Sequence, residues 1–232
     1  MKRVALAGLL ALPRTAASRP FELDLPAPVR AKRDVAELAS KAVIITLFTM
    51  MAIRMGADFL VTGRVTGLLL VVSEALVVIL TVLRRSAAVV DRSGRARLLT
   101  TLSMIGPPLV RPATLQALAP ETLTVLLSAA GLIFVVAGKL SLGRSFGLMP
   151  ANRGIVSTGL YGFVRHPIYV GYLITHVAFV TANPLATNLG VLLIADAALL
   201  MRAVCEEQTL ARDPTYREYL QKVRWRMVPG LF

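Results

Sequence analysis

The stretch "YGFVRHPIYVGY" (161–172) sets an arginine, a histidine and a proline side by side, directly before an apolar run. Proline is favoured in the first turn of a helix, where its missing N–H is not needed. The stretch therefore predicts a helix that begins at Pro167. The free N–H groups at such a helix start attract anions, and Arg165 and His166 add donors there. Arginine and tyrosine are also common anchors at a membrane boundary, so this stretch alone leaves both a binding site and an anchor open.

The composition assigns that helix to a membrane protein. Hydrophobic residues make up 56% of the 232 residues and charged residues only 17%, whereas soluble domains carry about 25% charged residues. A spanning helix needs about 17–25 mostly apolar residues. We predict an all-α polytopic membrane protein with about six transmembrane helices. The alternative is about five, because Pro107 and Pro108 interrupt the third apolar run. The expected spans are 38–60, 65–83, 98–118, 122–140, 167–183 and 186–204.

The charge distribution predicts an orientation. The segment "RRSAAVVDRSGRAR" (84–97) holds five arginines and one aspartate, and 139–165 holds four basic residues and no acid. By the positive-inside rule both face the cytosol, and the uncharged "NPLATN" (183–188) faces the other side. Both termini are then cytosolic, and the Ala-, Arg- and Leu-rich composition suggests a bacterial inner membrane. The net charge of +13 does not indicate nucleic-acid binding, because the basic residues lie between apolar runs rather than on one face.

The chain divides by composition into three parts. Residues 1–37 are basic and Pro-rich, 38–140 hold the first spans, and 141–232 carry the polar motifs. The start "MKRVALAGLLALPRTAAS" imitates a signal peptide. We favour a cytosolic or interfacial segment instead, because the charge pattern needs this end in the cytosol. The single cysteine and the wide spacing of His166 and His176 argue against a metal site.

A second polar cluster ends the last predicted span. Glu206 and Glu207 stand there, where basic residues would be usual. The last two spans form a hairpin centred between residues 185 and 186, so position 166 mirrors position 205. Arg165 and His166 should therefore lie level with the two glutamates, to within about one helical turn, or ~5 Å. Groups of opposite charge that converge in this way indicate a site rather than an anchor.

The segment after the last span predicts a short amphipathic helix. Asp213 can cap this helix, and Pro214 can occupy its first position. Aromatic and apolar residues then share one face. This face comprises Tyr216, Tyr219, Leu220 and Val223. The helix is either an anchor at the membrane surface or a lid over the site.

Ionisable residues inside spans are functional candidates by default. His176 and Asp196 should lie at similar depths, about 12–15 Å into their helices, so we expect a hydrogen bond between them. A clamp between two helices is the favoured role. The alternative is a substrate tunnel lined by Glu74, His176 and Asp196. Arg54 and Asp58 are expected to pair at i, i+4 spacing.

These motifs resemble the isoprenylcysteine carboxyl methyltransferase family of integral-membrane enzymes, and the related phospholipid methyltransferases. The resemblance covers about residues 141–229, and the preceding residues match only in being hydrophobic. Its motifs are "SLGRSFGLMPANRGIVSTG" (141–159), "GLYGFVRHPIYVGY" (159–172), "EEQTL" (206–210), "YREYL" (216–220) and a late arginine before "VP". The family ending often reads close to V-P-R-x-x-P, whereas this chain reads "VRWRMVP". Arg224 and Arg226 therefore stay alternatives for the arginine that faces the substrate.

The resemblance implies S-adenosylmethionine as the cofactor, held at the cytosolic ends of the last two spans beneath the C-terminal segment. It implies catalytic roles for Arg202, Glu206 and Arg226, and no metal. The implied cofactor-binding residues are Tyr161, Arg165, His166, Pro167, Tyr169, Gly171, Glu206, Glu207, Tyr216 and Tyr219. The chemistry agrees, because a helix start suits the cofactor's carboxylate and aromatic faces suit its sulfonium.

We therefore predict methyl transfer to a lipophilic acceptor, with a carboxylate preferred, as in isoprenylcysteine carboxyl methylation. The nearest alternative is N-methylation of a phospholipid headgroup, whose amine would need no arginine. More distant alternatives are an NADPH-dependent membrane reductase and a non-enzymatic membrane scaffold or transporter. The expected partners are membrane lipids and the lipophilic acceptor, without nucleic acid.

Overall fold

The computed structural model describes residues 27–83, 89–91, 93–145, 151–152 and 154–230. The predicted N-terminal interfacial segment lies largely outside these residues. The described chain is helical apart from two short strands and two 3-10 turns, in agreement with the predicted all-α class. Its elements are α1 (Ala27–Thr62), α2 (Thr66–Leu83), β1 (Val89–Val90), α3 (Gly94–Leu109), α4 (Glu121–Leu142), η1 (Gly143–Ser145), β2 (Ala151–Asn152), η2 (Gly159–Gly162), α5 (Pro167–Ala182), α6 (Ala186–Leu210) and α7 (Pro214–Lys222).

Three described helices are long and apolar enough to cross a membrane. They are Ile45–Thr62 within α1, Glu121–Leu142 and Ala186–Leu210. The number of spans and their orientation remain predictions. The expected third span, 98–118, is wrong in its bounds, because α3 begins at Gly94 and ends at Leu109, directly after Pro107 and Pro108. Two prolines remove two backbone donors from the last turn, and the chain turns extended at Val110.

The chain forms two compact units, Met1–Ser40 and Lys41–Phe232. The described part of the first unit is the beginning of α1. The second unit holds the rest of α1, every other element and both polar clusters. All packing described below lies within the second unit.

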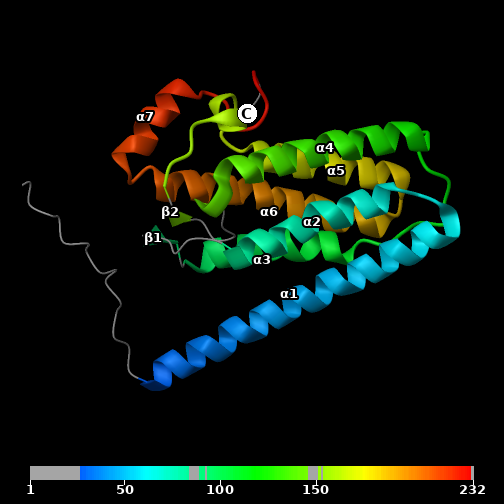
Figure 1. Ribbon diagram of the computed structural model, residues 1–232, viewed down its shortest axis with the longest axis horizontal. Helices are drawn as coiled ribbons and strands as arrows, with labels where there is room; N and C mark the ends of the chain where they lie inside the picture. The colour runs from blue at the N-terminus through cyan, green and yellow to red at the C-terminus, as the bar shows by residue number, and fades with distance from the viewer. Residues whose placement is uncertain (1–26, 84–88, 92, 146–150, 153, 231–232) are drawn as a thin grey trace, which may run out of the picture. The chain divides into compact units, whose positions relative to one another are not determined.

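Glycines let the helices around α5 approach closely. Helix α5 runs along α4 (Figure 1), and a Cβ at Gly131 of α4 would stand 2.7 Å from the carbonyl oxygen of Gly171. Small residues in this position allow close packing of membrane helices. Gly171 of α5 makes room for α4 in turn, because its Cβ would meet the α4 backbone at Gly131 and Val135. Helix α3 packs along α6 in the same way, with Gly106 against Ala195.

A hydrophobic cluster supports the start of α5. Ile168, Tyr169 and Tyr172 of α5 pack there against α4 and α6, and Met227 of the C-terminal tail closes the cluster. Helix α5 is buried on most sides along its whole length. Side chains in such a close-packed interior are held in fixed positions, so the first turn of α5 is a rigid platform.

The two basic segments predicted on one side of the membrane meet in the structure. β1, from the first segment, pairs antiparallel with β2, from the second. This pairing agrees with a common side for both segments. At the other end, the predicted pair of Arg54 and Asp58 is wrong, because Asp58 accepts a 2.6 Å hydrogen bond from Arg64 and Arg54 donates to the carbonyl of Pro108.

Candidate active site

The first turn of α5 begins at Pro167, as predicted, with His166 at its N-cap. The chain before it is held by the C-terminal tail. The N–H of Arg165 donates to the carbonyl of Trp225 at 2.9 Å, and the N–H of His166 donates to that of Arg226 at 2.8 Å. The tail therefore returns to the start of α5, a contact that the sequence gave no means to predict.

Glu207 joins the two polar clusters that the sequence predicted to lie level. Its carboxylate accepts hydrogen bonds from Arg165 Nη1 at 3.3 Å and from Arg226 Nε at 3.0 Å. His166 Nε2 lies 3.2 Å from the other carboxylate oxygen. The predicted convergence of opposite charges is thereby confirmed. Arg165 also donates to the carbonyls of Val223 and Leu220, so Glu207 and Arg165 together tie α5, α6 and the tail to one another.

The hydroxyl of Tyr169 joins a second group of charged side chains. It donates to Glu206 Oε2 at 2.9 Å and accepts from Arg202 Nε at 2.9 Å. The Arg202 guanidinium also lies over the Tyr169 ring, 5.0 Å from its centroid, and donates to Ser103 of α3 at 3.2 Å. The His166 ring stacks on Tyr169 with centroids 5.1 Å apart. These contacts fix a cation, a carboxylate and two aromatic rings beside one another.

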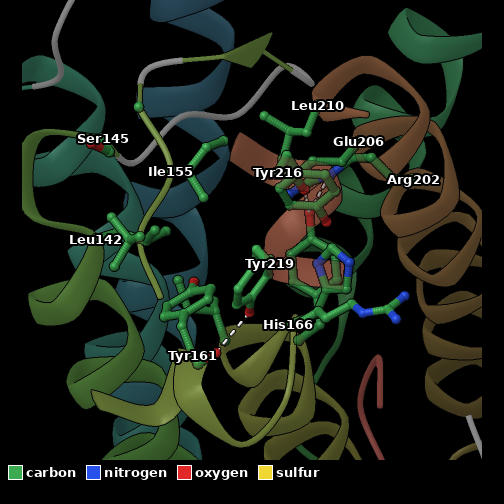
Figure 2. A pocket seen from close by; sticks show the side chains of 15 residues that line it. Leu142, Ser145, Ile155, Tyr161, His166, Arg202, Glu206, Leu210, Tyr216 and Tyr219 are labelled. Carbon is green, nitrogen blue, oxygen red and sulfur yellow. Dashed lines mark hydrogen bonds between the residues drawn. The ribbon is translucent and has the colours of Figure 1, made fainter. Parts of the chain in front are cut away.

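A cavity opens beside these groups (Figure 2). Its walls come from the end of α4, the segment before η2, the start of α5, the end of α6, and α7. The lining residues are Leu142, Ser145, Gly154, Ile155, Val156, Tyr161, Arg165, His166, Ile168, Tyr169, Arg202, Glu206, Leu210, Tyr216 and Tyr219. We call this space the polar cavity.

Helix α7 covers one side of the polar cavity. Asp213 caps the helix through the N–H of Thr215, and Pro214 occupies its first turn, as predicted. Tyr216 and Tyr219 turn inward and pack with Val223, and the Tyr219 hydroxyl donates to the carbonyl of Tyr161 at 2.7 Å (Figure 2). Burial raises the pKa of Tyr219 to about 12, so this hydroxyl keeps its proton at neutral pH. The helix is packed as a lid requires.

Most of the predicted catalytic and cofactor-binding residues line the polar cavity, and four of them do not. The residues absent from its wall are Pro167, Gly171, Glu207 and Arg226. Arg226 donates a hydrogen bond to Glu207, and neither residue lines the cavity. Arg224 instead lies over the Trp225 ring, 5.6 Å from its centroid. Of the two late arginines, Arg226 is therefore the one that contacts the predicted site.

The sequence prediction did not name the wall residues Leu142, Ser145 and 154–156. Leu142, Ser145 and Ile155 border the polar cavity (Figure 2). Their stretch was noted only as part of the family resemblance, because it has neither charged pairs nor a helical period. Ile168 and Leu210 were also missed, although each lies next to a predicted residue or one turn from it.

A second cavity lies among α2, α3, α5 and α6. The three predicted tunnel residues, Glu74, His176 and Asp196, all line it. His176 Nδ1 lies 2.6 Å from Asp196 Oδ1, which confirms the predicted hydrogen bond. We call this space the inner cavity. It shares one wall with the polar cavity, formed by Ile168, Tyr169 and Arg202.

Fold and site together define a helical membrane protein whose last two long helices end in a polar cavity lined by charged and aromatic side chains. Residues 122–212 match the model of the isoprenylcysteine carboxyl methyltransferase (ICMT) family, and this match supports the assignment to that family. The family assignment supports a membrane-integral methyltransferase. No curated protein matches the chain.

The matched region runs from α4 to just past the end of α6. It contains the shared wall and Glu207, but not α7 or the tail. The family match therefore does not extend to Tyr216, Tyr219 and Arg226, and their place at the site is supported by the geometry. Within the described residues, no group of three or more histidine, cysteine, aspartate or glutamate side chains could hold a metal ion.

Proposed function

We propose that the protein transfers a methyl group from S-adenosylmethionine to the carboxylate of a lipophilic acceptor. The shared wall is the observation that carries this proposal. On one side lies the polar cavity beneath α7, and on the other lies the inner cavity among membrane helices. A water-soluble donor and a lipophilic acceptor can approach this wall from opposite sides, at Tyr169 and Arg202.

The residues of the polar cavity fit S-adenosylmethionine. When bound, this cofactor supplies a methyl group activated by a positive sulfonium. The rings of His166, Tyr169 and Tyr216 give faces of the kind that accommodate such a cation. The carboxylate of Glu206 can accept hydrogen bonds from ribose hydroxyls.

Arg202 is the residue proposed to hold the acceptor. Its guanidinium is buried, with an exposed fraction of 6%, and a buried guanidinium is well suited to bind a carboxylate. Tyr169 and Ser103 fix its position. Methyl transfer to a carboxylate joins groups of opposite charge, so alignment and exclusion of water matter most. Tyr216 and Tyr219 would exclude water from above.

Binding of the cofactor is the first test. We expect detergent-purified protein to bind S-adenosylmethionine and S-adenosylhomocysteine with micromolar Kd in calorimetry. Glu206→Gln and His166→Ala should each weaken binding at least about tenfold, because each removes a cavity contact to the ligand. Glu218→Gln is the matched control, because Glu218 is an exposed carboxylate of α7. Absence of binding by folded wild-type protein would overturn the proposal.

The chemistry of the product is the second test. Labelled methyl groups should be transferred to lipid-soluble carboxylic acids, and the label should be released as methanol by mild alkali. A methyl group transferred to a phospholipid amine would stay bound under the same treatment. An alkali-stable product in the phospholipid fraction would replace the carboxyl acceptor with the headgroup amine.

A further inference from the structure

The inner cavity is more polar than a site for a plain hydrocarbon chain needs to be. Part of its wall is apolar: Met104, Pro107, Ile168, Ala195 and Leu199. The part away from the shared wall carries Glu74, His176 and Asp196. Burying ionisable groups is costly unless they are hydrogen-bonded. An apolar chain at that end would leave this cost uncompensated.

Two polar atoms at this end have no partner. Glu74 Oε1 and His176 Nε2 are buried and lack a hydrogen bond within the described part of the chain. The two residues are only 5% and 3% exposed. Buried polar atoms are nearly always satisfied in native proteins, so a ligand group is the natural partner for these two.

The bond between His176 and Asp196 determines what that group must be. Asp196 accepts through Oδ1, so His176 Nδ1 carries the proton. In the neutral imidazole Nε2 is then an acceptor. A carboxylate oxygen of Glu74 is an acceptor as well. Both unpartnered atoms therefore call for a hydrogen-bond donor.

Because Lys139 lies near Glu74, a neutral hydrogen-bond donor on the ligand is sufficient at this end of the cavity. The Lys139 ammonium donates at 3.0 Å to the carbonyl of Ser73, the residue before Glu74, and lies 5.2 Å from the ring centroid of Tyr172, which lines the inner cavity. A positive charge is thus already present beside the Glu74 carboxylate. A hydroxyl supplies the missing donor without adding a second cation.

The helices fix how far this donor lies from the reacting group. His176 follows Tyr169 by seven residues on α5, which is about 10 Å along the axis. Asp196 precedes Arg202 by six residues on α6, or about 9 Å. The two helices give nearly the same distance from the shared wall.

We propose that the inner cavity selects acceptors carrying a hydroxyl, or an equivalent neutral hydrogen-bond donor, about 10 Å from the methylated carboxylate. Glu74 and His176 accept from this donor, and Asp196 orients His176. This inference rests on the proposed function, because the methylated end is assigned to Arg202. An unsubstituted isoprenyl chain would lack the donor, so the preferred acceptor is a bifunctional lipophilic acid.

The test compares acids that differ in one group. Saturated carboxylic acids carry a hydroxyl, a methoxy group or a hydrogen about 10 Å from the carboxyl group, and a fourth acid carries the hydroxyl halfway along. Their Kd is measured by calorimetry with protein loaded with S-adenosylhomocysteine. We expect the first acid to bind about 10–100-fold tighter than the other three, because the site accepts hydrogen bonds that only this acid donates there.

Variants identify the residues responsible. His176→Phe preserves the ring that stacks on Tyr172 but removes Nε2, and Glu74→Leu removes the carboxylate. Each should reduce the preference for the hydroxyl to about twofold, with the affinity for S-adenosylhomocysteine unchanged. Glu218→Gln should retain the full preference. The preference is a ratio within one preparation, so partial loss of folded protein does not change it.

The outcomes separate the two proposals. Equal Kd values for the hydroxylated and unsubstituted acids in the wild type would overturn this inference and leave the methyltransferase proposal intact. A preference that persists in both inner-cavity variants would also overturn it. Failure to bind S-adenosylhomocysteine, by contrast, would overturn the proposed function.

Discussion

The two ends of the α5–α6 hairpin are both polar, but they use their polar groups differently. At the connecting end, Asn188 accepts from the N–H of Arg111 at 2.9 Å and donates to the carbonyls of Arg111 and Asn183. Asn183 in turn accepts from the N–H of Ala113 at 2.9 Å. These amides bond mainly to backbone, and they bind the segment after α3 to the hairpin.

At the other end, the polar groups form hydrogen bonds with one another and border the polar cavity. Tyr169 stands between Glu206 and Arg202, and all three border the polar cavity. The comparison shows that burial and hydrogen bonding do not by themselves indicate function. Polar groups that satisfy the backbone stabilise the fold, whereas charged groups that border a cavity are available to a ligand.

Loss of Arg202 should give the largest effect. Arg202→Met keeps much of the side-chain length and removes the guanidinium. We expect methyl transfer to fall about 100–1000-fold, as when a positioned donor is removed from an active site. The Kd for S-adenosylmethionine should change less than about fivefold, because Arg202 is assigned to the acceptor. Labelled transfer and calorimetry measure the two effects. Equal losses in both would move Arg202 to the cofactor side of the wall.

Loss of Asn188 should affect stability instead. Asn188→Leu removes three hydrogen bonds, two of them to the backbone of Arg111, so we expect a loss of about 3 kcal/mol in unfolding free energy. The melting temperature in detergent should fall, while cofactor binding well below that temperature stays unchanged. A tenfold weaker Kd for the cofactor in a folded variant would contradict the division between the two ends.

Two glycines, one packed against a neighbouring helix and one not, extend the comparison to helix packing. A Cβ at Gly131 would lie 2.7 Å from a backbone carbonyl of α5, whereas one at Gly190 of α6 would meet nothing within 4 Å. Gly131→Ala should cost about 1–3 kcal/mol through overpacking. Gly190→Ala should stabilise by up to about 1 kcal/mol, since alanine is the better helix former. Melting temperatures of the two variants should move in opposite directions, and a shared direction would show that backbone propensity outweighs packing.

The sequence was sufficient for the parts of the site that depend on one helix or one hairpin. Pro167 marked the start of α5, and the mirror relation across the hairpin brought His166 to Glu207. The depth of His176 and Asp196 followed from the same rise per residue. Such predictions succeed because an α-helix has a fixed geometry and a short connection fixes the register.

Contacts that depend on irregular chain could not be predicted. The return of the tail to Arg165 and the wall formed by Ser145 and Ile155 involve segments without a hydrophobic period. The neighbour of Gly171 could not be predicted for a related reason. A glycine shows that something approaches its backbone, but the sequence does not tell whether that neighbour is a ligand or another helix.

The smallest effect should come from the Asp213 cap of α7, at the cavity end of the hairpin. Hydrogen bonds from Asn152 and from the N–H of Thr215 lower the pKa of Asp213. A lowered pKa stabilises the folded lid fully above the unfolded pKa, about 3.9. That contribution disappears as the pH falls through the lower pKa of the folded state. Acid should therefore loosen α7, and Trp225, the single tryptophan, can report this by fluorescence.

Asp213→Asn separates this effect from other acid-sensitive groups. Asparagine caps a helix about as well as aspartate but does not titrate, so cofactor affinity at pH 7 should stay within about twofold. The other carboxylates of the chain are the same in both proteins, so the difference between their profiles isolates Asp213. We expect the wild type to lose more lid structure than the variant as the pH falls below about 4. Identical fluorescence profiles would mean that the Asp213 cap does not hold the lid, and that the contact between Tyr219 and Tyr161 holds it alone.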